Sequence, residues 1–381
     1  MYEPKKDDMF YMTVKFLRLL YLYPSDSQQR HLGRYYFLSG LIRFVSSFVL
    51  LECIIHTTMS IKNNNYFDLT EDIVGITGLT NSMILCVKFQ VYAKEWSQLF
   101  KDLADTSKFG EPKELRKISI KMNLYSFLYS AYCVVGVSIY ALVKMLEKGN
   151  CEKLNKEKNI QNICGIVAPF WWPHNNINTL FKSLIIFYQV YSIGVYVPPS
   201  ATICFLPWEC AKILSVKIDH LKTLFLHVFD CEDLAQKKKR LQFCILYHNE
   251  ILRLAEETRE RTRINVGQLS IVGAIVMSCI GNQMLKQYSV GALIHLAGYL
   301  VAVYFICEAG QIIKNDTESV SDSIWSSRWH TDLKLSKDLK IVIQRSQKPV
   351  TLTSYLLGDF DYGLLIVIIK TTYSYLTLLT R

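Results

Sequence analysis

The sequence has few charged residues and lacks the short motifs of the common enzyme classes. Charged residues make up 20% of its 381 residues. It contains no P-loop, no Gly-x-Ser-x-Gly elbow, no dinucleotide-binding glycine pattern and no His-Glu-x-x-His pair. The eight histidines are scattered, and none of the eleven cysteines forms a Cys-x-x-Cys pair. We therefore expect no catalytic residue, no metal and no cofactor.

Long apolar runs are present instead. Half of the residues are apolar, aromatic residues reach 13%, and the mean hydropathy is positive. Several runs approach the roughly 20 residues that cross about 30 Å of hydrocarbon. The N-terminal stretch has no short apolar core followed by a small-residue cleavage site, so we expect the first span to act as its own insertion signal. The sequence predicts an integral membrane protein.

Seven spans account for the apolar runs and predict an all-α fold of seven transmembrane helices. The spans are expected at about 35–61, 70–92, 123–146, 180–207, 265–285, 290–313 and 357–380. The fourth carries Pro198, Pro199 and Pro207, which remove backbone donors and are expected to kink or break it.

The distribution of Lys and Arg predicts the orientation. They gather in the N-terminal arm and in the loops 93–122, 208–264 and 314–356. By the positive-inside rule these segments are cytoplasmic and the C-terminus is extracellular. This explains much of the net charge of +10 without a nucleic-acid partner. The orientation is opposite to that of a G-protein-coupled receptor, and the motifs Asp-Arg-Tyr and Asn-Pro-x-x-Tyr of that class are absent.

The inner loop 208–264 is predicted to contain an amphipathic helix at about 237–262. Its apolar residues recur at helical spacing on one face; they are Leu241, Ile245, Ile251, Leu252 and Ala255. We favour packing against extensions of the spans. The alternative is a membrane-surface helix whose residues 237–240 touch anionic lipid.

Four segments carry a resemblance to a known family. They are PFWWP at 169–173, LQFCILYHNEILRLAEETRE, ESVSDSIWSSRW at 318–329, and RSQKPVTLTSYLLGDFDYGLLIVIIKTTYSYLTLL near the C-terminus. In this order, and with this topology, the chain resembles the insect odorant receptors, on the odorant-tuned rather than the co-receptor branch. The resemblance covers most of the chain and is strongest in its last third.

The resemblance implies a ligand-gated, poorly selective cation channel in the plasma membrane of olfactory sensory neurons. An odorant-tuned subunit assembles with co-receptor subunits into a heterotetramer whose pore is lined by the last helix of each subunit. The cytoplasmic extensions at about 208–264 and 314–356 form an anchor domain. Because the co-receptor has a longer inner loop, this chain is interpreted as the tuning subunit, in contact with membrane lipid and a small volatile ligand.

Two other interpretations stay open. A gustatory-receptor-like homomeric channel fits Thr372-Tyr373, but Leu379-Thr380 stands where that family has Gln-Phe. A membrane transporter would fit the proline-rich fourth span, but the odd number of spans and the absence of an internal repeat weaken it.

The last helix carries the expected pore residues. From Asp361 to Arg381 a helix would be about 31 Å long, one full crossing. We expect this helix to form the wall of the pore, which would explain why the chain ends there. Thr372, Leu376 and Thr380 share one face. By position Leu376 and Thr380 match the family's pore constriction, and Leu376 is the expected hydrophobic gate, with an ordinary packed leucine as the alternative. Lys370, near the middle, is expected to pair within its own subunit rather than to face the ion path.

The resemblance places the ligand pocket in the outer half of the bundle, between the second, third, fourth and sixth spans. A small, mostly apolar volatile held by packing, with one or two hydrogen bonds, suits it. The candidate residues, for each of which helix packing or lipid contact is an equal alternative, are Thr77, Thr80, Asn81, Cys133, Gly136, Ile139, Tyr140, Phe187, Tyr188, Tyr191, Ser192, His295 and Tyr299. Cys151 and Cys164 share the loop 147–179, and a disulfide between them is left open.

Overall fold

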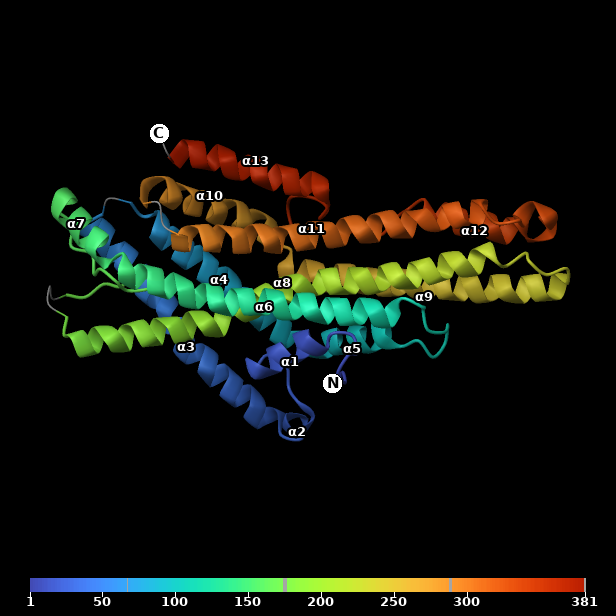
Figure 1. Ribbon diagram of the computed structural model, residues 1–381, viewed down its shortest axis with the longest axis horizontal. Helices are drawn as coiled ribbons and strands as arrows, with labels where there is room; N and C mark the ends of the chain where they lie inside the picture. The colour runs from blue at the N-terminus through green and yellow to red at the C-terminus, as the bar shows by residue number, and fades with distance from the viewer. Residues whose placement is uncertain (67, 174–176, 288–289, 380–381) are drawn as a thin grey trace.

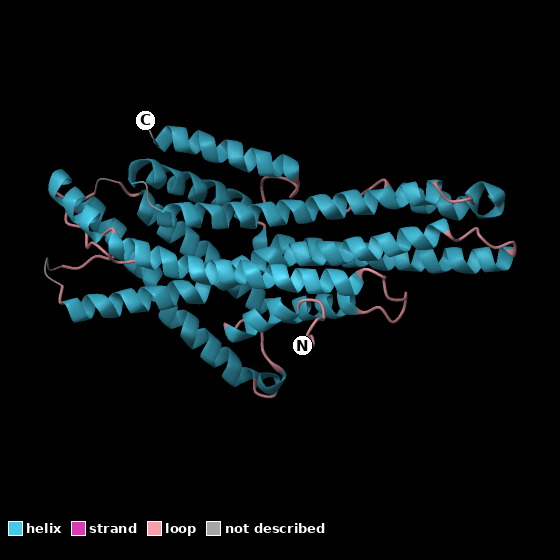
Figure 2. Cartoon of the chain, viewed as in Figure 1, coloured by secondary structure: helices cyan, strands magenta, loops and turns pink. Residues whose placement is uncertain are grey.

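The computed structural model describes residues 1–66, 68–173, 177–287 and 290–379. In these residues nearly every element is a helix, and loops and turns join the helices (Figure 2). The only extended pairing among them is an isolated bridge between Thr353 and Asp359. The predicted all-α fold is confirmed.

Seven helices in the described part of the chain are long and apolar enough to cross a membrane. They are α3 (Leu32–Lys62), α4 (Thr70–Val91), α6 (Leu115–Leu146), α8 (Thr179–Leu226), α10 (Leu269–Gln287), α11 (Val290–Trp325) and α13 (Tyr362–Leu379). Number and order agree with the seven predicted spans. The last begins at Tyr362 rather than at residue 357, because residues 357–361 belong to a turn.

Several of these helices continue far beyond the apolar segments. Helix α8 has 48 residues, so it is about 72 Å long, more than twice the thickness of a hydrocarbon core. Helix α9 (Leu234–Val266) packs along it and against α5 (Ala93–Ala104), and α12 (Ser336–Ser346) packs on α11. In Figure 1 α9 and α12 lie at one end of the long axis, and α7 (Lys148–Lys158) lies at the other.

Helix α9 is the amphipathic helix expected from the sequence, and it packs against other helices. Leu241, Ile251, Leu252 and Ala255 are buried, and Ile245 is half-buried. The expectation of helix packing is confirmed, since α8 and α5 cover its apolar face.

The prolines do not break α8, so the expected break is wrong. Pro198, Pro199 and Pro207 lie inside one continuous helix. Each is surrounded by buried residues where α8 runs between α6 and α11. The hydroxyl groups of Ser200 and Thr202 donate to the carbonyls of the preceding turn, at 2.8 and 3.0 Å. Protein neighbours thus stabilise the proline-containing segment, as membrane helices require.

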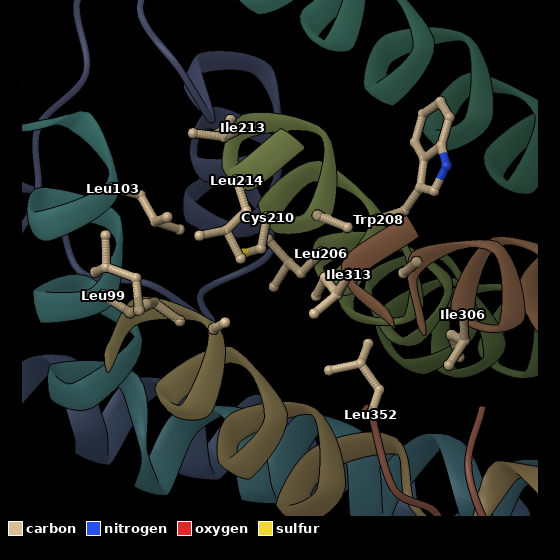
Figure 3. Close-up of a cluster of buried hydrophobic side chains, with 14 of the residues drawn as sticks. Leu99, Leu103, Leu206, Trp208, Cys210, Ile213, Leu214, Ile306, Ile313 and Leu352 are labelled. Carbon is tan, nitrogen blue, oxygen red and sulfur yellow. The ribbon is translucent and has the colours of Figure 1, made fainter. Parts of the chain in front are cut away.

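One part of the hydrophobic core lies where α8 packs against α5 and α11. Figure 3 shows Leu99 and Leu103 of α5, Leu214 of α8 and Ile313 of α11 around this point. Leu352, from the segment before α13, is fully buried in the same cluster.

The N-terminal segment docks on this core. Helix α1 (Tyr11–Leu19) lies against α6 and α8, and α2 (Asp26–Gln29) leads into α3. The Thr13 hydroxyl donates to Oε2 of the buried Glu209 at 2.7 Å and lies 2.6 Å from the Ser126 hydroxyl. This contact joins the N-terminal segment to α6 and α8, two of the helices that line the cavity described next.

Candidate functional site

A cavity of about 190 Å³ lies among α4, α6, α8 and α11. Two glycines make room for it. A Cβ atom on Gly78 would lie 3.2 Å from the Tyr299 hydroxyl oxygen, and one on Gly136 would lie 3.4 Å from Cγ2 of Ile294. Small residues at these positions let large side chains of the facing helices reach the cavity wall.

Aromatic side chains form much of the wall. Tyr132, Tyr140, His295 and Tyr299 line the cavity. The rings of Tyr140 and His295 meet edge to face with centroids 6.1 Å apart, and those of His295 and Tyr299 are 5.4 Å apart. The Tyr132 hydroxyl donates to the Ile294 carbonyl at 2.7 Å, which fixes that ring. Such a surface suits an apolar molecule held by packing.

Three polar side chains face the cavity at one side. Ser82 and Ser200 lie 3.1 Å apart, oxygen to oxygen, so their hydroxyls bond to each other. Asn81 is 4% exposed, and its Oδ1 has no hydrogen-bond partner among the described residues. The cavity therefore combines an apolar wall with one unpaired amide oxygen.

A loop closes one side of the cavity. Val167, Ala168 and Pro169 line it, and the backbone N–H groups of Val167 and Ala168 both donate to Oε1 of Gln189 at 3.0 Å. Gln189 is fully buried, and its amide donates to the Ala168 carbonyl and to Glu52, each at 3.1 Å.

The same loop is tied to α7 by a disulfide between Cys151 and Cys164, whose Cα atoms are 5.6 Å apart. Its position is therefore set at two neighbouring points, by this bond at residue 164 and by the amide of Gln189 at residues 167 and 168.

A second, polar cavity of about 410 Å³ adjoins the first and shares Glu71, Ala168 and Pro169 with it. The Lys144 ammonium lies 2.7 Å from the Glu71 carboxylate at this boundary. On its far side, burial opposes ionisation of Asp68, but hydrogen bonds from Lys286 and the Thr70 N–H prevail and lower its pKa. An ion pair thus separates a charged vestibule from an apolar cavity.

Helix α13 lies at the edge of the bundle, along α10 and α11 (Figure 1). A tight turn leads into it: the Phe360 N–H donates to the Leu352 carbonyl at 2.7 Å, and Gly358 adopts a φ of +91°. The turn presses on α11 at Gly310, where a Cβ atom would lie 1.7 Å from the Phe360 carbonyl oxygen. Only glycine permits this approach.

A family model described as the 7tm odorant receptor family matches residues 68–373. The chain belongs to the odorant receptor family. It is accordingly a multi-pass membrane protein of a receptor family, not a member of an enzyme family.

Other odorant receptors share limited sequence with it. Odorant receptors 85b, 67a and 85c of Drosophila melanogaster are 26%, 25% and 24% identical over 140, 142 and 152 residues. These matches cover 35%, 36% and 39% of this chain and 36%, 35% and 39% of the relatives. The matched region thus spans little more than a third of the curated relatives.

The fold is that of a solved odorant receptor over nearly its whole length. The insect olfactory receptor OR5 from Machilis hrabei superposes with a TM-score of 0.71 at 14% identity, covering 97% of this chain and 96% of that chain. Its complex with eugenol gives 0.68 at 12% identity, covering 96% and 97%.

The structure of this odorant receptor brings together six of the thirteen candidate pocket residues. Asn81, Cys133, Gly136, Tyr140, His295 and Tyr299 line the cavity, from three of the four helices expected. The fourth helix, α8, contributes residues that were not predicted, among them Ile193, Val197 and Ser200.

The other seven candidates do not line the cavity; they are Thr77, Thr80, Ile139, Phe187, Tyr188, Tyr191 and Ser192. Phe187 and Tyr191 are 74% and 45% exposed on the outer side of α8. The Tyr188 hydroxyl donates to the Val45 carbonyl of α3 at 2.8 Å. Ser192 is fully buried between helices.

The candidate pore residues of this odorant receptor are placed as follows. Leu376 is half-buried and points at α10, where a Cβ atom on Gly281 would lie 3.3 Å from its Cδ2. Thr372 is also half-buried. Thr380 lies outside the described residues.

Lys370 does not have the partner within its own subunit that the sequence led us to expect. Its side chain is exposed and makes no ion pair with a described residue. The reason is its angular position on α13, which packs on the bundle through Leu364 and Ile368.

Proposed function

We propose that the chain is an odorant-tuned receptor subunit. It binds a small, mostly apolar volatile molecule in the cavity among α4, α6, α8 and α11 and gates a non-selective cation pore lined by α13. The cavity is the observation that carries this proposal. Its volume of about 190 Å³ lies below the roughly 300–1,000 Å³ typical of drug-sized ligands, and its wall is largely apolar and aromatic. A protein of the same fold was solved in complex with eugenol.

The exposed side of α13 supports its role as the pore helix. Lys370, Tyr373 and Ser374 all face away from the rest of the subunit. A lysine near the middle of a lipid-facing span costs at least about 2.5 kcal/mol. This side of α13 is therefore expected to face a neighbouring subunit or a water-filled path.

The gate is proposed at Leu376, with Tyr373 as the alternative on the exposed side. A cationic thiol reagent separates the two in Leu376→Cys and Tyr373→Cys channels. Modification that reduces the current only in Leu376→Cys supports the first gate. Modification only in Tyr373→Cys would assign the constriction to the exposed face and contradict a gate at Leu376. The unsubstituted chain, treated alike, is the control.

The proposed assembly is a heterotetramer with the odorant co-receptor in the plasma membrane of olfactory sensory neurons. The N-terminus lies in the cytoplasm and the C-terminus outside, in agreement with the positive-inside rule. Helices α9 and α12, with the inner ends of α8 and α11, then form the cytoplasmic anchor that joins the subunits. Lipid covers the exposed apolar residues of α3 and α6, such as Phe44, Phe48 and Phe127.

Whole-cell current during a panel of volatile compounds tests the proposal. The chain is expressed with and without an insect co-receptor, and surface labelling confirms that it reaches the membrane. We expect a fast inward cation current only with the co-receptor. Current from this chain alone would instead indicate a gustatory-like homomer. Ligand-dependent uptake without channel-sized current would indicate a transporter.

A further inference from the structure

The amide of Asn81 is a buried polar group of the cavity wall that the described residues leave unpaired. Among the described residues that line it, Asn81 is the one with a buried side-chain oxygen that lacks a hydrogen-bond partner. A primary amide offers two donors and an acceptor with two lone pairs, and no described residue bonds to either end of this one. Because buried polar groups are nearly always paired, an unpaired one in a cavity requires an explanation.

We infer that Asn81 binds the ligand through a hydrogen bond, and that the cavity is selective for small neutral alcohols. This inference rests on the proposed odorant-binding function and specifies the class of odorant. A hydroxyl group combines a donor for the amide oxygen with an acceptor for the amide nitrogen. An ether or a ketone can only accept, and would leave the Asn81 oxygen unpaired.

The other polar groups at the cavity exclude charged ligands. A carboxylate would need a free cation, but the Lys144 ammonium is already paired with Glu71 at 2.7 Å. An amine would need a free carboxylate, and Glu71 is the acidic residue that lines the cavity. Burying an unpaired charge is far costlier than burying a hydroxyl. Neutral polar ligands are therefore favoured.

Three of the hydroxyl groups at the cavity are already engaged. Ser82 and Ser200 bond to each other, and the Tyr132 hydroxyl is engaged by the Ile294 carbonyl. The remaining wall offers glycines and rings to an aliphatic, terpenoid or aromatic body. The ligand is thus an apolar molecule with one hydroxyl group directed at α4.

Matched pairs of probes test this inference by direct binding to the full chain in lipid nanodiscs. The pairs are 1-octanol, geraniol and 2-phenylethanol, each with its methyl ether, and ligand-dependent thermal stabilisation gives the apparent affinities. We expect the best-binding alcohol to bind about tenfold more tightly than its ether, as for one well-made hydrogen bond.

Variants locate the source of that preference. In Asn81→Leu the ratio between alcohol and ether should fall to about one. In Thr80→Val, one residue along the same helix but outside the cavity, it should stay near tenfold. Asn81→Leu without ligand should unfold at the same or a higher temperature, which shows that it is folded; Asn81→Ala serves if leucine overfills the site.

Three results would overturn the inference: equal binding of alcohol and ether to the unsubstituted chain, a tenfold ratio that survives in Asn81→Leu and Asn81→Ala, or no binding of any of the three alcohols. None of these decides the proposed function. That function is judged by odorant-evoked current across the wider panel, which includes esters, ketones and hydrocarbons.

Discussion

Removing the amide of Gln189 should release the loop that lines one side of the cavity among α4, α6, α8 and α11. In Gln189→Met a side chain of similar length loses all four hydrogen bonds of the amide. The buried N–H groups of Val167 and Ala168, now 3.0 Å from the Gln189 oxygen, become unpaired. Each unpaired buried donor costs about 1–3 kcal/mol, so closure of the loop weakens by about 2–6 kcal/mol. Loops of low local stability open when they lose this much free energy.

Hydrogen exchange measures this opening directly. A loss of about 3 kcal/mol corresponds to exchange more than 100-fold faster at residues 167 and 168, visible in a peptide covering 159–173. Gln98→Met on α5 is the matched control, because its exposed amide bonds only to Asp102 among the described residues. Unchanged exchange of the 159–173 peptide in Gln189→Met, with the variant folded, would refute the assignment of Gln189 as the residue that holds the loop.

Two further perturbations have outcomes set by single contacts. Gly310→Ala places a methyl group where the Phe360 carbonyl now lies, and should destabilise the protein by about 3 kcal/mol or more in thermal unfolding; Gly194→Ala, with open space around it, should be neutral or slightly stabilising. Equal melting temperatures for the two variants would contradict the close contact. Burial, with a smaller contribution from Arg345, lowers the pKa of His248 from 6.5 to about 4. Between these values the unfolded chain binds a proton that the folded chain does not, so stability falls as the pH drops, by about 3 kcal/mol at pH 4. His248→Leu should remove that loss in unfolding at pH 7 and pH 4.5; an unchanged pH dependence would show that His248 is not its source.

The number and order of the spans could be predicted because each is a continuous apolar run. What lies beyond the membrane could not be predicted in the same way. Helix α6 begins at Leu115 and α8 continues to Leu226, beyond the predicted spans. These extensions were not predicted as parts of the spans because polar residues lower their hydropathy although the backbone stays helical. The prolines of α8 were misjudged for a different reason. Their effect depends on the packing of α6 and α11 around them, which a single sequence does not display.

The residues that line the cavity were hard to predict because the sequence does not show which face of each span points into the bundle. In water an apolar stripe marks the inner face of a helix, but lipid removes that contrast, and α8 has no distinct apolar stripe. Phe187 and Tyr191 were therefore assigned to the cavity although they face outward. Gln189 was overlooked, yet a glutamine within an apolar span is itself a signal of an interior position.

Helix α11 lines the cavity with Tyr299, and its Gly310 contacts the turn before α13. The two residues are about 16 Å apart along one uninterrupted helix. If the helix stays rigid, the two residues therefore move together. A tilt of the helix by about 4° about one residue displaces the other by about 1 Å. Over such a distance a packed contact loses up to half of its attraction. A displacement of α11 at the cavity would therefore reach the turn before α13 through a single continuous helix.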